Sequence, residues 1–255
     1  MSNFLKRTIT GILFVLLILS SIIVSRYYFA ALFLLITIAC LIEFYSIVNS
    51  SSSIQIMFTG VITGSLIYIF SSLTALKLID ERFLYINLLL IFLVFAITLF
   101  NKTNYLRKVS SITTGIIYIV IPFAILNFYY QPGFMKGEKI YSLLIGFFLL
   151  VWVNDVFAYL VGSKIGRNKL FERVSPSKTW EGSFGGFVFT IIVAYFLNDF
   201  FGMLSRKEWI IMAVIIVLFG TFGDLVESMI KRDANIKDSG KLLPGHGGVL
   251  DRFDA

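Results

Sequence analysis

The chain alternates long apolar windows with short polar segments. Crossing the hydrocarbon core of a bilayer takes roughly 20 consecutive apolar residues in a helix. Eight windows of about that length occur along the sequence. They predict an all-α, polytopic membrane bundle of about eight transmembrane helices, at residues 8–24, 28–48, 54–73, 83–100, 110–130, 140–161, 183–201 and 209–230.

Composition supports a membrane protein over a soluble one. Apolar residues make up 58% of the 255 residues, a share that soluble domains of this length rarely reach. The basic start at Lys6 and Arg7, followed by an apolar stretch, is also typical of a signal peptide. Because no convincing small-residue cleavage site follows and more spans come at once, we expect a membrane anchor there.

The distribution of basic residues predicts the orientation. Lysine and arginine are retained in the cytoplasmic segments of membrane proteins. With the N-terminus inside, these segments hold 15 of the 22 basic residues. We therefore expect a cytoplasmic N-terminus and cytoplasmic polar loops, in a multi-pass protein of the cell inner membrane. The net charge of +7 then mainly reflects topology, which disfavours a nucleic-acid partner but allows anionic lipid or nucleotide phosphate.

The two halves of the chain differ in polar content. Residues 1–139 are predicted to form a transmembrane scaffold of about five helices, in which Glu43 is the charged exception and is expected at the interface or paired within the bundle. Within residues 140–255, ionisable groups and glycines lie inside or at the ends of spans, where a charge is costly and suggests function. The single cysteine, Cys40, lies inside the second span and is expected to be an apolar filler.

Asp155 lies in the middle of the sixth span. Asp155, Ala158, Tyr159 and Gly162 follow the spacing of one helical stripe, which predicts that they face other helices or a watery cavity. A structural aspartate bonded to a neighbouring helix is the alternative interpretation.

A polar segment at residues 174–187, VSPSKTWEGSFGGF, precedes the seventh span. Pro176 stops any earlier helix, and either Ser175 or Thr179 can cap a new one whose free N–H groups favour an anion. Lys178 and the nearby Lys169 add positive charge, so the segment is predicted to bind phosphate. The alternative is a plain capped helix entering the membrane.

The same segment carries Gly182 and Gly186 at a spacing that permits close contact between helices. We therefore predict that the seventh span packs tightly on a neighbour through a face of small residues.

The eighth span ends in a second polar stripe. Asp224, Glu227, Ser228 and Lys231 are spaced to share one helix face, which combines two carboxylates with a cation. Carboxylates without a Cys or His cluster suit Mg²⁺ with phosphate rather than zinc. The predicted metal ligands are Asp224 and Asp251, the latter just after a glycine-rich turn.

The glycine-rich segment near the end of the chain completes the predicted site. Its glycines let the backbone approach a ligand and present N–H groups to phosphate. Phosphoryl or nucleotidyl transfer then needs alignment and charge neutralisation rather than a covalent nucleophile. His246 is predicted to bind phosphate or donate a hydrogen bond rather than act as a base. The other residues concerned are Gly240, Gly245, Gly247, Gly248, Lys231, Arg232, Lys237, Lys241 and Arg252.

Three segments resemble the phosphatidate cytidylyltransferase family, also called CDP-diacylglycerol synthases. Residues 228–254, SMIKRDANIKDSGKLLPGHGGVLDRFD, are similar to the family signature over their whole length. SPSKTWEG resembles a second family segment, with Ser177 where a lysine is usual, and NDVFAYLVGSKIGRNKL resembles the family's aspartate-bearing helix. The resemblance covers roughly residues 152–254.

This resemblance implies a membrane enzyme that joins CTP and phosphatidic acid to give CDP-diacylglycerol and pyrophosphate. It implies Mg²⁺ with a neighbouring K⁺, a homodimer, and in-line attack of the lipid phosphate on the α-phosphorus of CTP. Residues 140–255 would then be the catalytic region. The expected catalytic residues are Asp224, Asp251, Lys231 and Arg232, with Asp224 and Asp251 as metal ligands. The expected substrate-binding residues are Asp155, Ser175, Lys178, Thr179, Lys237, Asp238, Lys241, His246, Gly247 and Arg252.

Family members usually continue after the signature into a ninth membrane helix, which is absent from this sequence because it ends at Ala255. The sequence is a natural short form, a truncated one or an incomplete one. Other interpretations are a CTP-using enzyme for another lipid, such as a polyprenol kinase or an ether-lipid synthase, a transporter with Asp155 and Asp224 on a cation path, and an inactive scaffold. The fuller signature disfavours the first, and the absence of a convincing internal repeat disfavours the transporter.

Overall fold

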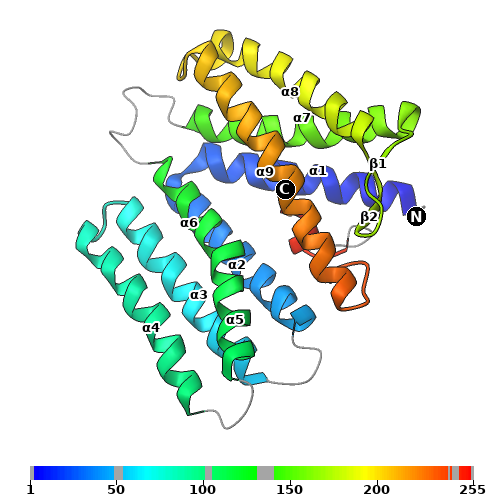
Figure 1. Ribbon diagram of the computed structural model, residues 1–255. Helices are drawn as coiled ribbons and strands as arrows, with labels where there is room; N and C mark the ends of the chain where they lie inside the picture. Colours follow the sequence, from blue (N-terminus) through cyan, green and yellow to red (C-terminus); the bar gives the residue numbers. More distant parts are fainter. Residues whose placement is uncertain are drawn as a thin grey trace. The chain divides into compact units, whose positions relative to one another are not determined.

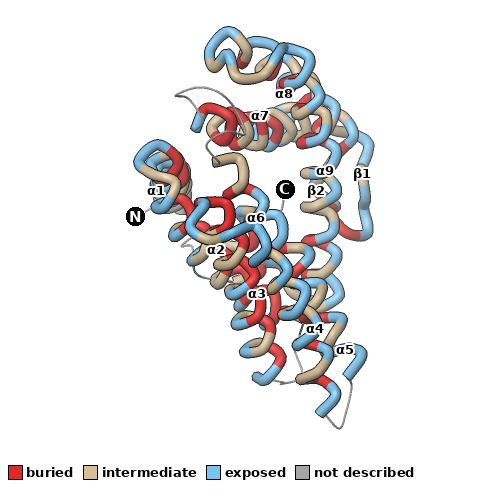
Figure 2. The backbone as a smooth tube through the Cα atoms, turned by 90° about the vertical axis from the view of Figure 1, so that its left-hand side faces the viewer, coloured by how far each residue is buried: buried red, intermediate tan, exposed pale blue. Residues whose placement is uncertain are grey.

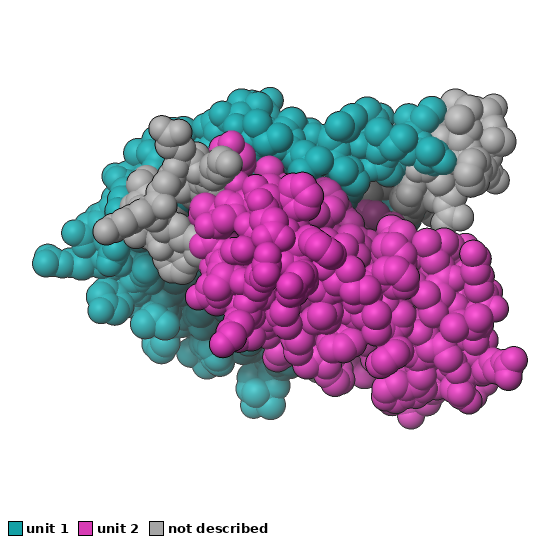
Figure 3. Space-filling view, turned by 90° about the horizontal axis from the view of Figure 1, so that it is seen from above, with its two compact units in different colours: residues 1–136, 238–251 teal, residues 137–237, 252–255 magenta. Residues whose placement is uncertain are grey.

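The computed structural model describes residues 3–48, 54–100, 105–130, 141–240, 242 and 247–253. The chain divides into two compact units, coloured separately in Figure 3. Unit 1 comprises residues 1–136 and 238–251, and unit 2 comprises residues 137–237 and 252–255. The structure therefore groups residues 238–251, most of the family-like signature, with the N-terminal helices.

The described part of unit 1 is helical, and its helices follow one another along the chain (Figure 1). They are α1 (Asn3–Val24), α2 (Arg26–Val48), α3 (Ile54–Ala75), the short η1 (Glu81–Leu84), α4 (Tyr85–Leu99), α5 (Tyr105–Gly115), η2 (Ile116–Val120) and α6 (Ile121–Phe128). A further short helix, η3 (Leu250–Arg252), follows near the end of the chain, with Leu250 and Asp251 in unit 1 and Arg252 in unit 2.

The rod formed by α5, η2 and α6 contains a proline. Pro122 lies at the start of α6, and the preceding η2 is a turn of π-helix. Proline lacks an N–H donor and its ring crowds the carbonyl four residues earlier. The wider π turn directly before it accommodates that loss while the chain continues as one membrane span.

The core of unit 1 is centred on α2 and α3, whose buried positions are red in Figure 2. Tyr45 is fully buried and donates a hydrogen bond to the Ile112 carbonyl at 3.1 Å. A Cβ added at Gly60 or Gly115 would collide with the Tyr45 ring. These glycines therefore let α3 and α5 pack closely around a large side chain of α2.

Unit 2 consists of three long helices and a hairpin (Figure 1). The helices are α7 (Tyr141–Ile165), α8 (Trp180–Phe201) and α9 (Arg206–Asp233), and the strands are β1 (Lys169–Phe171) and β2 (Ser175–Thr179). A capping box between Ser205 and Glu208 begins α9. Helix α7 packs along α8, and α9 packs on both.

Glycines set the close approach of α7 and α8. A Cβ at Gly182 would lie 2.7 Å from the Ala158 carbonyl oxygen, and one at Gly186 would lie 2.7 Å from Asn154 Oδ1. Any larger residue at these positions would have to push the helices apart. The predicted small-residue contact face is confirmed.

The hairpin was not predicted from the sequence. Strands β1 and β2 pair in antiparallel fashion, with Lys169 opposite Thr179 and Phe171 opposite Ser175. The strands are short, and β2 contains Pro176, so neither alternation nor length marks them in the sequence. Thr179 is the cap of α8, because its Oγ1 accepts a hydrogen bond from the Gly182 N–H at 3.2 Å. Of the two predicted candidates for the cap, Thr179 is therefore the one that caps the helix, whereas Ser175 lies inside β2.

The prediction of an all-α, polytopic membrane bundle is confirmed. Among the described residues, seven helices are long and apolar enough to cross a membrane, and residues 8–24 form a shorter apolar helix. Each of the eight predicted windows coincides with one of these segments to within a few residues. The direction in which the chain crosses the membrane stays a prediction.

Candidate functional site

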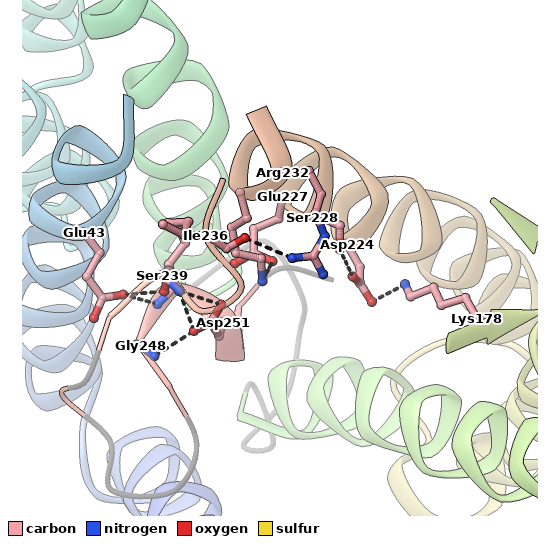
Figure 4. Close-up of polar contacts among 12 residues, drawn as sticks. Glu43, Lys178, Asp224, Glu227, Ser228, Arg232, Ile236, Ser239, Gly248 and Asp251 are labelled. Atoms are coloured by element: carbon pink, nitrogen blue, oxygen red, sulfur yellow. Dashed lines mark hydrogen bonds and ion pairs between the residues drawn. The ribbon is translucent and has the colours of Figure 1, made fainter. Parts of the chain in front are cut away.

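Asp224 of α9 and Lys178 of β2 form the centre of the polar site in unit 2. Their side chains make an ion pair, and Ser228 Oγ donates to Asp224 Oδ1 at 3.3 Å (Figure 4). About a quarter of each side chain is accessible, 25% for Lys178 and 27% for Asp224. The two predicted segments at residues 174–187 and 224–231 are thus brought together by the fold, and their charged groups remain accessible to a ligand.

Glu181 fixes the turn that precedes the hairpin. Its carboxylate accepts hydrogen bonds from the Arg167 N–H and the Asn168 N–H, both at 3.1 Å, and from Asn168 Nδ2 at 2.8 Å. The Trp180 N–H donates to the Asn168 carbonyl at 3.0 Å. The segment SPSKTWEG therefore supplies a partly accessible cation in Lys178, a helix cap in Thr179 and a carboxylate in Glu181 that holds the preceding backbone turn.

Asp155 belongs to the same polar group. Its side chain is exposed on α7 and lies within electrostatic range of Asp224, Lys178 and Arg252, all of which are in unit 2. Of the predicted stripe, Tyr159 is 73% exposed, whereas Ala158 and Gly162 are adjacent to the α8 backbone. Asp155 can thus act on the Asp224 site through its charge.

The second pair on α9 has a different character. Glu227 and Lys231 form an ion pair one helical turn apart, with Glu227 only 1% exposed. The predicted face is therefore divided into two pairs, Asp224 with Ser228 and Glu227 with Lys231. The ammonium of Lys231 is neutralised within its own helix, and its predicted role towards phosphate stays a prediction.

The cationic end of α9 is more open. Arg232 is exposed and donates to the Ile236 carbonyl at 2.9 Å. Lys237, Asp238 and Arg252 are also exposed. Lys241 and His246 lie outside the described residues, so their predicted roles stay predictions.

Asp251 in unit 1 closes the glycine-rich segment. It is buried and accepts hydrogen bonds from the Ser239 N–H at 3.0 Å and the Gly248 N–H at 2.7 Å (Figure 4). Gly247 adopts a φ of +84°, in the left-handed region that favours glycine. The Gly248 N–H was among the backbone groups predicted to face phosphate. In the structure it donates to the Asp251 carboxylate instead.

Glu43 of α2 was not predicted as a site residue. Its carboxylate accepts hydrogen bonds from residues 239, 249 and 250 of the signature segment. Figure 4 shows its contact with Ser239. The signal available in the sequence was a single acid within an otherwise uncharged span, but its partners, about 200 positions away, could not be identified from spacing.

The donor chemistry of the site fits Mg²⁺. Asp224 and Asp251 offer carboxylate oxygens, and Mg²⁺ is usually held by one or two carboxylates together with waters and substrate phosphates. Within the described parts of the chain, no three His, Cys, Asp or Glu side chains gather in a metal-binding group. Asp224 belongs to unit 2 and Asp251 to unit 1, so their pairing in one metal centre stays a prediction.

Comparison with known proteins gives one consistent family. The model of the Cytidylyltransferase family matches residues 5–255. Over 167 residues the chain is 38% identical to the phosphatidate cytidylyltransferases of Staphylococcus epidermidis and Staphylococcus aureus. Over 134 residues it is 42% identical to the phosphatidate cytidylyltransferase of Staphylococcus haemolyticus.

These matches cover part of each relative. The aligned region is 64% of this chain and 61% of the Staphylococcus epidermidis and Staphylococcus aureus proteins, and 50% of this chain and 51% of the Staphylococcus haemolyticus protein. The chain thus matches less than two thirds of the length of these relatives.

Proposed function

Because the chain belongs to the cytidylyltransferase family, we propose that it transfers a cytidylyl group from CTP to phosphatidic acid. The products would be CDP-diacylglycerol, a precursor for phospholipid synthesis, and pyrophosphate. The observation that carries the proposal is the family match to residues 5–255, which includes both polar segments of the site. The names of the staphylococcal relatives supply the lipid substrate.

The reaction requires one bond to form and one to break. An oxygen of the phosphatidate phosphate attacks the α-phosphorus of CTP in line, and the bond from that phosphorus to the oxygen bridging to the β-phosphate breaks. The electron pair leaves with pyrophosphate. Because the phosphate monoester is already ionised near neutral pH, the step needs alignment and charge neutralisation rather than a general base.

The residues of unit 2 suit those two tasks. Lys178 can move its ammonium from Asp224 to a phosphate oxygen, since both side chains are partly accessible and the lysine stem is flexible. Arg232 and Arg252 are exposed and can neutralise further phosphate oxygens. The Asp155 carboxylate, close to Asp224 and Lys178, adds negative charge that favours a cation at the same place.

Asp224 and Asp251 are the residues that we propose to hold Mg²⁺. The bound ion would neutralise charge on phosphate oxygens. The predicted K⁺ and homodimer stay predictions. The proposed orientation places the N-terminus and the polar loops on the cytoplasmic side of the inner membrane, where CTP is available, and it rests on the excess of basic residues in those segments.

The direct test supplies membranes containing the full chain with labelled CTP and phosphatidic acid, with and without Mg²⁺. We expect label in a lipid-soluble product only when CTP, phosphatidic acid and Mg²⁺ are all present. If folded chain gives no such product under any of these conditions, the proposal is wrong. Ion flux across the same vesicles in place of product would support a transporter.

A further inference from the structure

Glu43 is an acidic side chain in a membrane helix whose binding partners come from the other end of the sequence. It is 5% exposed and accepts three hydrogen bonds. Ser239 Oγ donates to Oε2 at 3.0 Å, the Val249 N–H donates to Oε1 at 3.0 Å, and the Leu250 N–H donates to Oε2 at 2.9 Å. All of these residues belong to unit 1.

These contacts compensate the burial of the carboxylate. A buried charge is costly unless it is paired or hydrogen-bonded. Among the described residues, no lysine or arginine forms an ion pair with Glu43. Its charge is therefore stabilised by two backbone N–H groups and a hydroxyl of residues 239–250, and the helix and that segment depend on each other.

Ser239 connects Glu43 to Asp251. Its hydroxyl donates to Glu43, while its backbone N–H donates to Asp251 Oδ2 at 3.0 Å. Leu250, the neighbour of Asp251, is bound to Glu43 through its own N–H. Both ends of the segment that carries Asp251 are thus fixed to one carboxylate (Figure 4).

The glycines of the segment fit against the same carboxylate. A Cβ at Gly240 would lie 2.5 Å from Glu43 Oε1, and a Cβ at Gly248 would collide with Glu43 Oε2 and Ser239 Oγ. Larger residues at either position would displace the backbone from Glu43. Glycine is therefore required at both positions because the Glu43 carboxylate lies against the backbone there.

From these contacts we propose that Glu43 is a positioning residue for the signature segment. It orients the backbone at residues 239, 249 and 250, and through Ser239 and Leu250 it fixes the direction of the Asp251 carboxylate. This inference rests on the proposed function, because it is cytidylyl transfer that requires Asp251 to be held in one orientation. A residue that orients a ligand through a hydrogen bond typically changes metal affinity or activity by about 10- to 100-fold when it is removed.

The experiment compares Glu43→Gln with Thr37→Val in the full chain in lipid nanodiscs. Glutamine keeps the size of the side chain but removes its charge and turns an N–H₂ group towards the donors. Thr37 is a matched control, because it is buried on the same helix and its hydroxyl bonds only within α2, to the Phe33 carbonyl at 2.6 Å.

Hydrogen exchange is the first readout. In Glu43→Gln we expect the amides of Val249 and Leu250 to exchange at least about 10-fold faster, while peptides from α3 and α6 keep their protection. Thr37→Val should match the unmodified chain at every peptide. Unchanged exchange at both amides in Glu43→Gln would overturn the proposal.

The Mg²⁺ concentration for half-maximal transfer is the second readout. We expect it to rise about 10-fold or more in Glu43→Gln and to stay unchanged in Thr37→Val. Ser239→Ala removes one of the three hydrogen bonds to Glu43, and it should shift both readouts in the same direction but by a smaller factor. If Glu43→Gln does not fold, Ser239→Ala is the variant that tests the proposal. A fall in the amount of folded protein with an unaltered Mg²⁺ requirement would show a purely structural role and overturn the proposal.

The two readouts separate this proposal from the proposed function. If the unmodified chain shows no transfer, the proposed function fails, and the exchange of Val249 and Leu250 still decides whether Glu43 holds the segment. If the unmodified chain is active and Glu43→Gln leaves both readouts unchanged, Glu43 has no positioning role and the proposed function stands.

Discussion

Glu43 and Asp251 in unit 1 are held differently from Asp224 in unit 2. Glu43 and Asp251 are buried and accept hydrogen bonds from backbone N–H groups and a hydroxyl. Asp224 is partly exposed and pairs with a lysine that is equally accessible. A carboxylate bound by several fixed donors holds a backbone in place, whereas one paired with a flexible cation can exchange that partner for a ligand. We therefore expect Glu43 to act through the backbone that it holds, and Asp224 to be the carboxylate that can most readily exchange its partner for a ligand.

The largest expected effect is that of Asp224→Asn. Loss of the charge should reduce the transfer rate at least about 100-fold. Replacing a residue that only orients a metal ligand typically reduces metal affinity or activity by about 10- to 100-fold, and replacing the ligand itself should reduce activity at least as much. The rate of lipid product formation measures this. Asp199→Asn is the matched control, since Asp199 also pairs with a basic residue, Arg206, at 2.8 Å. We expect its rate to be within about twofold of the unmodified chain, like other surface ion pairs. Similar rates for the two variants would remove Asp224 from the metal site.

Lys178→Met tests whether the Lys178 ammonium leaves Asp224 to bind a substrate phosphate. The change keeps an unbranched stem and removes one charge-assisted interaction with phosphate. We expect kcat/KM for CTP to fall about 10- to 100-fold, mainly through KM. Steady-state kinetics over a range of CTP concentrations provides the measurement. Lys207→Met, at an exposed position near the start of α9, serves as the control. An unchanged KM for both CTP and phosphatidic acid in Lys178→Met would contradict the proposal that Lys178 binds a substrate phosphate.

Glu181→Ala tests whether a backbone clamp in unit 2 affects the chemistry indirectly. Without its three hydrogen bonds the turn before the hairpin should loosen, and the position of Lys178 with it. We expect a loss of activity on the order of 10-fold and faster hydrogen exchange in residues 167–171. Glu208→Ala removes a comparable acid from the start of α9 and should change stability alone. Equal activity losses in both variants would show that the Glu181 effect is not specific to the site.

Thr179→Val should give the smallest effect. It removes the cap of α8 and should lower the free energy of unfolding by about 1 kcal/mol, whereas Thr179→Ser keeps the acceptor. The thermal unfolding midpoint in detergent distinguishes the two. If both variants unfold at the same temperature as the unmodified chain, the cap contributes little to stability.

Much of the fold could be predicted from the sequence because a membrane restricts which secondary structures can cross it. Spans need about 20 apolar residues, so hydropathy located all eight helical segments. The contact between α7 and α8 followed from the spacing of Gly182 and Gly186. The hairpin was not predicted because β1 and β2 are short and β2 contains Pro176, so the segment lacks the alternation of apolar and polar residues that marks a strand.

The site was harder to predict than the fold. Helical spacing correctly grouped Asp224 with Ser228, since residues one turn apart are neighbours. It also placed Glu227 and Lys231 on that face, and these two residues form an ion pair. The role of Lys231 towards phosphate stays a prediction. Glu43 was treated as scaffold because its partners lie about 200 positions away, and a contact of that range depends on tertiary packing rather than on local pattern.

The position of the label in the products tests the central claim most directly. The purified full chain in phosphatidic acid liposomes would be supplied with CTP labelled in the α-phosphate or, separately, in the γ-phosphate, with Mg²⁺ present. Cytidylyl transfer predicts the α-label in lipid and the γ-label in pyrophosphate, with one pyrophosphate released for each labelled lipid. The γ-label in lipid would identify a kinase, and pyrophosphate release without labelled lipid would show simple hydrolysis. Either result would contradict the account.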